Sequence, residues 1–133
     1  MEENTSLINS DNILELPSNI VEYLLVKQMI NPVNTENMLF VKDHFKSSWF
    51  QNEQLIPLFQ IARNYISKYD TFPTKELIYK VLSTEKFEKN REKIKKEFEC
   101  VYSLDESKYS EKFIQDTIIS FTKRESGLLC YFR

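Results

Sequence analysis

The chain has 133 residues, of which 41% are hydrophobic and 29% charged, and its 18 basic and 20 acidic residues give a formal net charge of −2. This length suffices for one domain with a hydrophobic core. The near balance of charge argues against a surface dedicated to nucleic acid, and leaves a local basic patch open. No apolar run approaches the roughly 18 residues that a membrane span requires, so we expect no membrane contact.

Glycine and histidine are almost absent, which excludes several kinds of catalytic site. Gly127 is the single glycine, so neither a P-loop nor a dinucleotide-binding loop can form. His44 is the single histidine, which rules out histidine-based metal triads. A nucleophile pair of His44 with Cys100 or Cys130 stays open, although nothing in the sequence places these residues together. We expect no catalytic, cofactor-binding or metal site in this chain.

The cysteines and the amino-terminal segment indicate the compartment. Cys100 and Cys130 form no C-x-x-C motif, and we interpret both as free thiols in a reducing environment, with a disulfide or metal site as the alternative. Residues 1–16 form a polar leader whose acidic start is unlike a secretory signal. The expected location is the cytoplasm.

Two short helices are predicted first. Pro17-Ser18-Asn19 is typical of a helix start, and Glu22 follows Asn19 by three residues as in a capping box. Apolar residues continue at helical spacing to Met29, and Asn31-Pro32 ends this helix. The second helix is predicted over Thr35–Asp43, before a turn with buried aromatic residues at 44–50.

The segment from Trp49 to Leu82 predicts a long amphipathic helix, a turn and another helix. Asn52 can cap the long helix, and Pro57 is tolerated because it falls in the first turns. The predicted inward stripe is Leu55, Leu58, Phe59, Ala62, Tyr65, Ile66 and Tyr69. Asp70-Thr71-Phe72-Pro73 breaks the chain, and Thr74 caps a helix that turns Leu77, Ile78, Val81 and Leu82 inward.

The last part of the domain alternates charged and apolar residues. A highly charged helix is predicted from Thr84 to Tyr102, with a narrow stripe of Phe87, Ile94, Phe98, Val101 and Tyr102. Its basic residues alternate with glutamates, which favours a solvated face over nucleic-acid contact. A polar linker at 103–110 leads to a closing helix with Phe113, Ile114, Thr117, Ile118 and Phe121 on one side.

Together these elements predict an all-α fold, a compact bundle of about six helices over residues 17–126. The apolar tail at 127–133, ending LLCYFR, is unusual because chain termini are normally polar. It packs on the core, begins a following helical hairpin, or meets another subunit.

The order of these elements resembles the N-terminal domain of DnaB-type replicative DNA helicases, most closely the T-even phage version. The resemblance covers about residues 18–126 and rests on an aromatic pair that opens the long helix, a helix ending in tyrosine, and a proline-threonine turn before a leucine-rich helix. A charged helix and a closing helix follow in the same order. The residues that carry this signature are Phe50, Tyr69, Pro73, Thr74 and Leu77.

The resemblance implies a non-catalytic domain that acts in DNA replication. In that family the domain precedes a helical hairpin, a linker and a RecA-like motor, forms a collar over the hexamer, and helps to recruit primase and the helicase loader. ATP and Mg²⁺ would belong to the motor, and DNA contact to the parent helicase. The helicase-binding end of bacterial primase has a similar fold, so the resemblance does not fix which partner is which. If the chain is phage-encoded, its expected location is the host cytoplasm.

We therefore expect protein partners, namely a second copy of this chain, primase or the loader, and no small-molecule substrate. The candidate partner-interface residues are Trp49, Phe50, Phe72, Leu128, Leu129, Tyr131 and Phe132. Two alternatives remain. One is a stand-alone helical effector that binds a host replication protein. The other is a nucleic-acid-binding module that uses the basic residues between Lys86 and Lys96.

Overall fold

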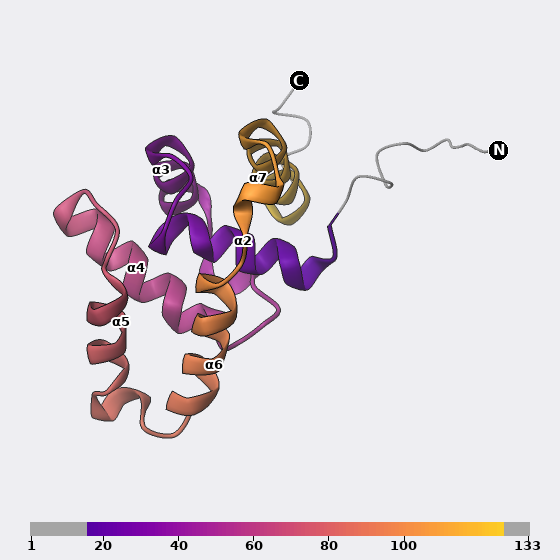
Figure 1. The fold of residues 1–133 in the computed structure, drawn as a ribbon. Coiled ribbons are helices and arrows are strands. Elements are labelled where there is room, and N and C mark those ends of the chain that lie inside the picture. The colour runs from indigo at the N-terminus through magenta and orange to yellow at the C-terminus, as the bar shows by residue number, and fades with distance from the viewer. Residues whose placement is uncertain (1–15, 127–133) are drawn as a thin grey trace.

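A computed structural model describes residues 16–126, which contain helices and no strand (Figure 1). The α-helices are α2 (Ser18–Ile30), α3 (Thr35–His44), α4 (Leu55–Tyr69), α5 (Lys75–Leu82), α6 (Arg91–Tyr102) and α7 (Glu111–Ser126). Three 3-10 helices lie between them: η1 (Ser47–Trp49), η2 (Glu85–Phe87) and η3 (Glu106–Lys108). The prediction of an all-α bundle of about six helices is confirmed.

Helix α2 is the centre of the bundle. It crosses the middle of the molecule in Figure 1, with α3 and α7 on one side and α5 and α6 on the other. It packs against α3, α4 and α6. From Val21 to Ile30 nearly all of its residues are buried, the polar Glu22, Lys27 and Gln28 among them, so other helices enclose it. The buried apolar residues of α2 are Val21, Leu24, Leu25, Val26, Met29 and Ile30.

Glu22 has a different role from the one its spacing predicts, because α2 has no side-chain cap. Its carboxylate is buried and accepts hydrogen bonds from the backbone N–H groups of Gln51 and Asn52, at 3.0 and 3.1 Å. The predicted capping box is therefore wrong. The carboxylate turns toward two donors that precede α4, and these lie too far along the chain for a local pattern to indicate them.

The α4–α5 segment follows its predicted pattern except at Asn52 and Tyr69. Asn52 does not cap α4, whose N-cap is Gln54 without a side-chain bond; the Asn52 Oδ1 accepts from the Gln54 N–H at 3.1 Å, one residue before the helix begins. Pro57 lies in the first turn of α4, and the Thr74 hydroxyl caps α5 by accepting from the Leu77 N–H at 3.1 Å. Leu55, Leu58, Phe59, Ala62 and Ile66 are fully buried, as are Ile78 and Leu82 of α5. Tyr69 is 54% exposed, so its predicted inward position is wrong. The helix ends there and Asp70 adopts a left-handed conformation with φ of 60°, which turns the chain away.

The charged helix begins later than predicted. The segment at 84–90 forms η2 and a turn, and α6 starts at Arg91. The Arg91 guanidinium donates to the carbonyls of Leu82, Ser83 and Thr84 at 2.6, 3.1 and 2.9 Å. These carbonyls stand at the end of α5, where a helix lacks internal donors and a cation is favourable. Arg91 thus holds the start of α6 against the end of α5.

The predicted linker at 103–110 is fastened to α2. Lys27 is buried, and its ammonium group donates to the carbonyls of Tyr102 and Leu104 at the end of α6. The Gln28 amide donates to the Glu106 carboxylate at 2.5 Å and accepts from the Val33 N–H at 3.2 Å. These bonds place η3 and the start of α7 beside α2. Within residues 16–126, no helix has the length and apolar character needed to cross a membrane.

Candidate functional site

Trp49 is half-buried in an aromatic cluster that joins η1 to α7. Its ring centroid lies 5.4 Å from that of Phe45 and 6.4 Å from that of Phe121. Phe45 and Phe121 are both buried and stack on one another at 5.5 Å. Trp49 also lines a small hollow of about 170 Å³ with Glu22 and Arg124. One face of Trp49 therefore holds the bundle together, and only the rest of the side chain can meet a partner.

Phe50 is a core residue and cannot form a partner surface. It is 4% exposed, and its ring lies 5.3 Å from that of Phe59. The prediction of Phe50 as an interface residue is therefore wrong, while its place in the fold signature agrees with its burial. The sequence does not indicate which of the two adjacent aromatic residues, Trp49 or Phe50, points inward, because the η1 turn sets the direction of both side chains.

The aromatic corner between α4 and α5 is exposed. We define it as Tyr65, Tyr69 and Phe72. Phe72 is 40% exposed, and the rings of Tyr65 and Tyr69 lie 4.7 Å apart. The Lys68 ammonium stands 5.5 Å from the Tyr69 ring centroid, a cation–π arrangement. Phe72 is thus accessible to a partner, and its role in an interface stays a prediction.

The remaining predicted residues divide into two groups. Pro73 is buried, Thr74 caps α5 and Leu77 is half-buried, so these signature residues shape the α4–α5 turn. Leu128, Leu129, Tyr131 and Phe132 lie outside the described residues, as does Cys130. Cys100 is a free, half-buried thiol. Among residues 16–126, the structure does not bring Trp49, Phe50 and Phe72 together into one surface.

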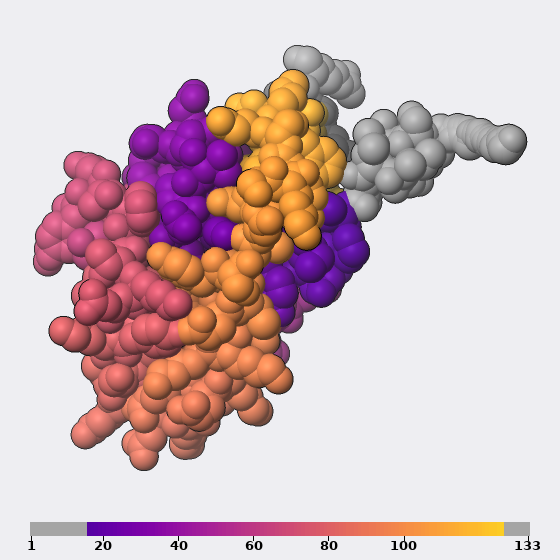
Figure 2. Space-filling model, viewed as in Figure 1, coloured from indigo at the N-terminus to yellow at the C-terminus, as the bar shows by residue number. Residues whose placement is uncertain are grey.

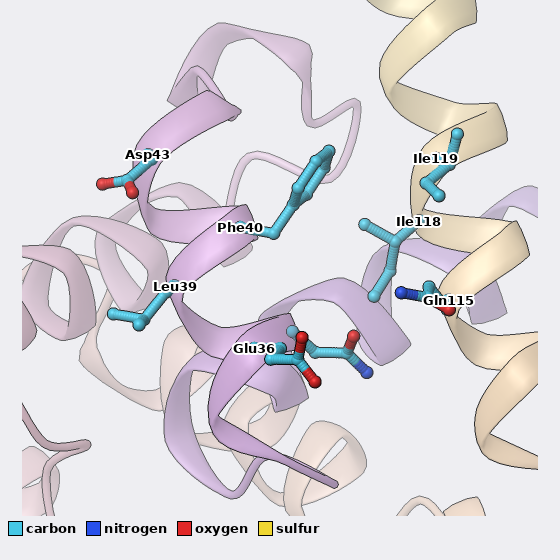
Figure 3. Close-up of a pocket in the computed structure, with 8 residues that line it drawn as sticks. Glu36, Leu39, Phe40, Asp43, Gln115, Ile118 and Ile119 are labelled. Carbon is cyan, nitrogen blue, oxygen red and sulfur yellow. The ribbon is translucent and has the colours of Figure 1, made fainter.

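A groove between α3 and α7 is a concave feature that the residue pattern did not indicate. It has a volume of about 360 Å³. Figure 2 shows α3 (purple) and α7 (yellow-orange) meeting along this face, and Figure 3 shows Phe40 and Ile118 directed toward one another across the groove. The lining residues are Glu36, Asn37, Leu39, Phe40 and Asp43 of α3 with Gln115, Ile118 and Ile119 of α7. The only sequence signal was Leu39-Phe40, two large apolar residues in a helix that needs one buried face.

The polar groups of the groove are acidic or lack a partner. Glu36 and Asp43 carry carboxylates, and no lysine or arginine is among the described residues that line the groove. Asp43 pairs with Lys42 at 3.0 Å, whereas Glu36 is exposed and makes no ion pair within 16–126. Asn37 is 4% exposed, and its amide nitrogen has no hydrogen-bond acceptor in that part of the chain. The groove thus offers apolar area, negative charge and one buried N–H donor.

His44, the single histidine, makes local contacts within α3. His44 ends α3, where its Nδ1 lies 3.0 Å from the Phe40 carbonyl and its ring stacks on Phe40. No group of three or more His, Cys, Asp or Glu side chains within residues 16–126 has the arrangement of a metal site. His44 therefore has a local packing role at the edge of the groove.

Two perturbed groups belong to the bonds that hold the helices together. Burial raises the pKa of Glu106, although the hydrogen bond from Gln28 opposes this shift. The Tyr23 hydroxyl donates to Glu97 at 2.6 Å, and this bond to a carboxylate raises the pKa of Tyr23 well above its usual range. Glu97 also accepts from Asn52 at 2.8 Å. Neither group lines the α3–α7 groove, so neither marks it as catalytic.

The basic residues of the charged helix are partly committed to structure. Arg91 is held by three carbonyls. Lys75 of α5 pairs with Glu99 at 3.6 Å and stands 4.9 Å from the centre of the Tyr102 ring. Lys95 lies 5.9 Å from the Tyr79 ring centroid. These contacts reduce the cationic surface that nucleic acid would need.

Comparison with known proteins gives no relative: no protein-family model, no curated protein and no solved structure matches this chain.

Proposed function

We propose that this chain is the N-terminal protein-interaction and oligomerisation domain of a phage replicative helicase of the DnaB type. In this proposal it acts in the assembly of the hexamer collar and in recruiting primase or the helicase loader. It does no catalysis, and the ATPase motor belongs to another part of the parent protein.

The observation that carries the proposal is the order of helices through the α4–α5 turn. A long helix ends at Tyr69, Asp70 reverses the chain, Pro73 is buried in the turn and Thr74 caps the next helix. A charged helix and a closing helix follow, in the order that the resemblance implies. The sequence signature thus coincides with a structural joint, which supports a common fold; function follows only by analogy.

Surface character gives a second line of support. The aromatic corner places Phe72 and Tyr69 in solvent, and aromatic residues are enriched where proteins bind one another. The α3–α7 groove adds a concave apolar surface. A small helical domain with both features is suited to binding proteins.

The first test is the reading frame that follows Arg133 in the source genome. The proposal expects a helical hairpin, a linker and then a G-x-x-x-x-G-K-[ST] loop. A stop codon at that position would refute the helicase assignment and favour the stand-alone effector. This test is independent of any binding assay.

The second test is self-association, measured by sedimentation velocity over about a hundredfold range of concentration. We expect Phe72→Ser to weaken association of the chain, or its binding to the primase of the same genome, by at least about tenfold. The matched control is Glu92→Ser, at an exposed position of α6. Unchanged association and primase binding in Phe72→Ser would exclude the aromatic corner as the contact.

A further inference from the structure

We infer that the α3–α7 groove is the docking site for a basic amphipathic helix of a partner protein. This inference rests on the proposed function in taking the chain to be a protein-interaction domain, and it names the surface and the chemistry of the partner. Its physical basis is the apolar floor, the acidic rim and one buried donor that has no acceptor.

The floor of the groove suits apolar side chains of an incoming helix. Phe40 and Ile119 are half-buried. Leu39 borders the groove on the side of α3 that faces away from α7 (Figure 3), and it is 37% exposed although it is a large apolar residue. Covering such apolar area removes it from water, which favours binding. A helix presents side chains at i, i+3 and i+4 on one face, and this spacing fits a groove formed by two helices. The volume of about 360 Å³ has room for anchors of this kind.

The rim selects the charge of the occupant. Glu36 and Asp43 lie two turns apart on α3, and no described lysine or arginine lines the groove. A partner with Lys or Arg beside its apolar anchors would find the Glu36 carboxylate at one end; at the other end, the Asp43 carboxylate already pairs with Lys42 at 3.0 Å. An acidic helix would meet like charge, which disfavours binding. Charge therefore argues for a basic partner.

Asn37 supplies a feature that packing alone does not explain. A buried polar group without a hydrogen bond destabilises the fold. Asn37 is only 4% exposed, and its Nδ2 has no hydrogen-bond acceptor in residues 16–126. An oxygen from a side chain of the docked helix would satisfy this donor. The groove is thus incomplete as it stands.

The test is selection from a displayed library of short helical peptides, using the full chain as bait and the Leu39→Asp variant for counter-selection. Leu39 is on the surface, so its replacement leaves the core intact, which circular dichroism checks. We expect enrichment of helices with apolar residues at i and i+3 or i+4 flanked by Lys or Arg. An enriched peptide should lose at least about tenfold in affinity on Leu39→Asp.

Charge reversal provides the matched pair. Glu36→Lys should weaken binding of the enriched peptide by about tenfold, and less so at high salt. Glu85→Lys makes the same change at an exposed position of η2, outside the groove, and should leave affinity unchanged. Failure of the library to enrich helices over the Leu39→Asp bait, or equal effects of the two reversals, would overturn the inference.

The wild-type chain and its variants also test two other possible occupants of the groove. If a second copy fills the groove, wild-type self-association is lost in Leu39→Asp. If the segment 127–133 fills it, its deletion shifts the NMR methyl signals of Leu39 and Ile119. Either result would overturn the assignment to a partner helix. Neither depends on whether the reading frame encodes a motor, so the inference and the proposed function fail separately.

Discussion

Replacing Glu22 tests the core of the fold most directly, because its carboxylate joins α2 to the residues that precede α4. It accepts from the Gln51 and Asn52 N–H groups at 3.0 and 3.1 Å, and the residue is 4% exposed. A hydrogen bond to a charged group contributes about 1.5–3 kcal/mol. Because both bonds are only part-buried, we expect Glu22→Ala to cost about 2–3 kcal/mol in total.

The isosteric variant refines this value. Glu22→Gln keeps one acceptor oxygen and turns an NH₂ group toward the second N–H, so we expect a loss of about 1–2 kcal/mol. Urea denaturation followed by circular dichroism gives the free energy of unfolding. For a chain of this size, each 1 kcal/mol lowers Tm by about 3–5 °C. Glu22→Ala should therefore melt about 10 °C below the wild type.

A matched control is Glu53→Ala, a nearby exposed glutamate whose loss should change stability by less than about 0.5 kcal/mol. Hydrogen exchange gives a second readout, since the N–H groups of Gln51 and Asn52 should exchange faster in Glu22→Ala. If Glu22→Ala loses no more stability than Glu53→Ala, the buried carboxylate is not a structural acceptor and our reasoning about α2 is refuted.

Three further substitutions probe other parts of the molecule. Asn37→Leu removes a buried amide nitrogen that has no acceptor in residues 16–126. Urea denaturation should show about 1 kcal/mol more stability, and peptide binding in the groove should weaken. A loss of stability would contradict this. Burial raises the pKa of Glu106 above its ordinary value of 4.5. The stability that the protonated carboxyl contributes is therefore present below pH 4.5 and is lost as pH rises through the raised pKa. Glu106→Gln should flatten the pH dependence of Tm and raise Tm at neutral pH. Thr74→Ala removes the α5 cap and should cost about 1 kcal/mol, whereas an unchanged Tm would exclude the Thr74–Leu77 bond.

Local rules predicted most of the helices, because their signals are short-range. Pro57 near a helix start, Thr74 as a cap and the spacing of Leu55, Leu58 and Ile66 each depend on neighbours within a few residues. These features follow from backbone hydrogen bonding and from the helical period. They needed no knowledge of the rest of the chain.

The errors arose where distant contacts decide the outcome. Glu22 bonds to residues about thirty positions away, and Arg91 bonds to the end of another helix. Phe50 looked like surface because it adjoins Trp49, yet it packs on Phe59. The α3–α7 groove forms between helices far apart in sequence, so no window of residues contains it. Only assembly of the bundle reveals such features.

The polar residues inside α2 have a consequence for how the chain chooses a single arrangement. Glu22 reaches the connection before α4, while Lys27 and Gln28 reach two points of the connection between α6 and α7. If α2 shifted by one residue or rotated by a fraction of a turn, all three would lose their partners at once, whereas apolar contacts would merely be exchanged. The central helix thus encodes the register of the fold, and the outer helices can change their surfaces without altering how the chain is threaded.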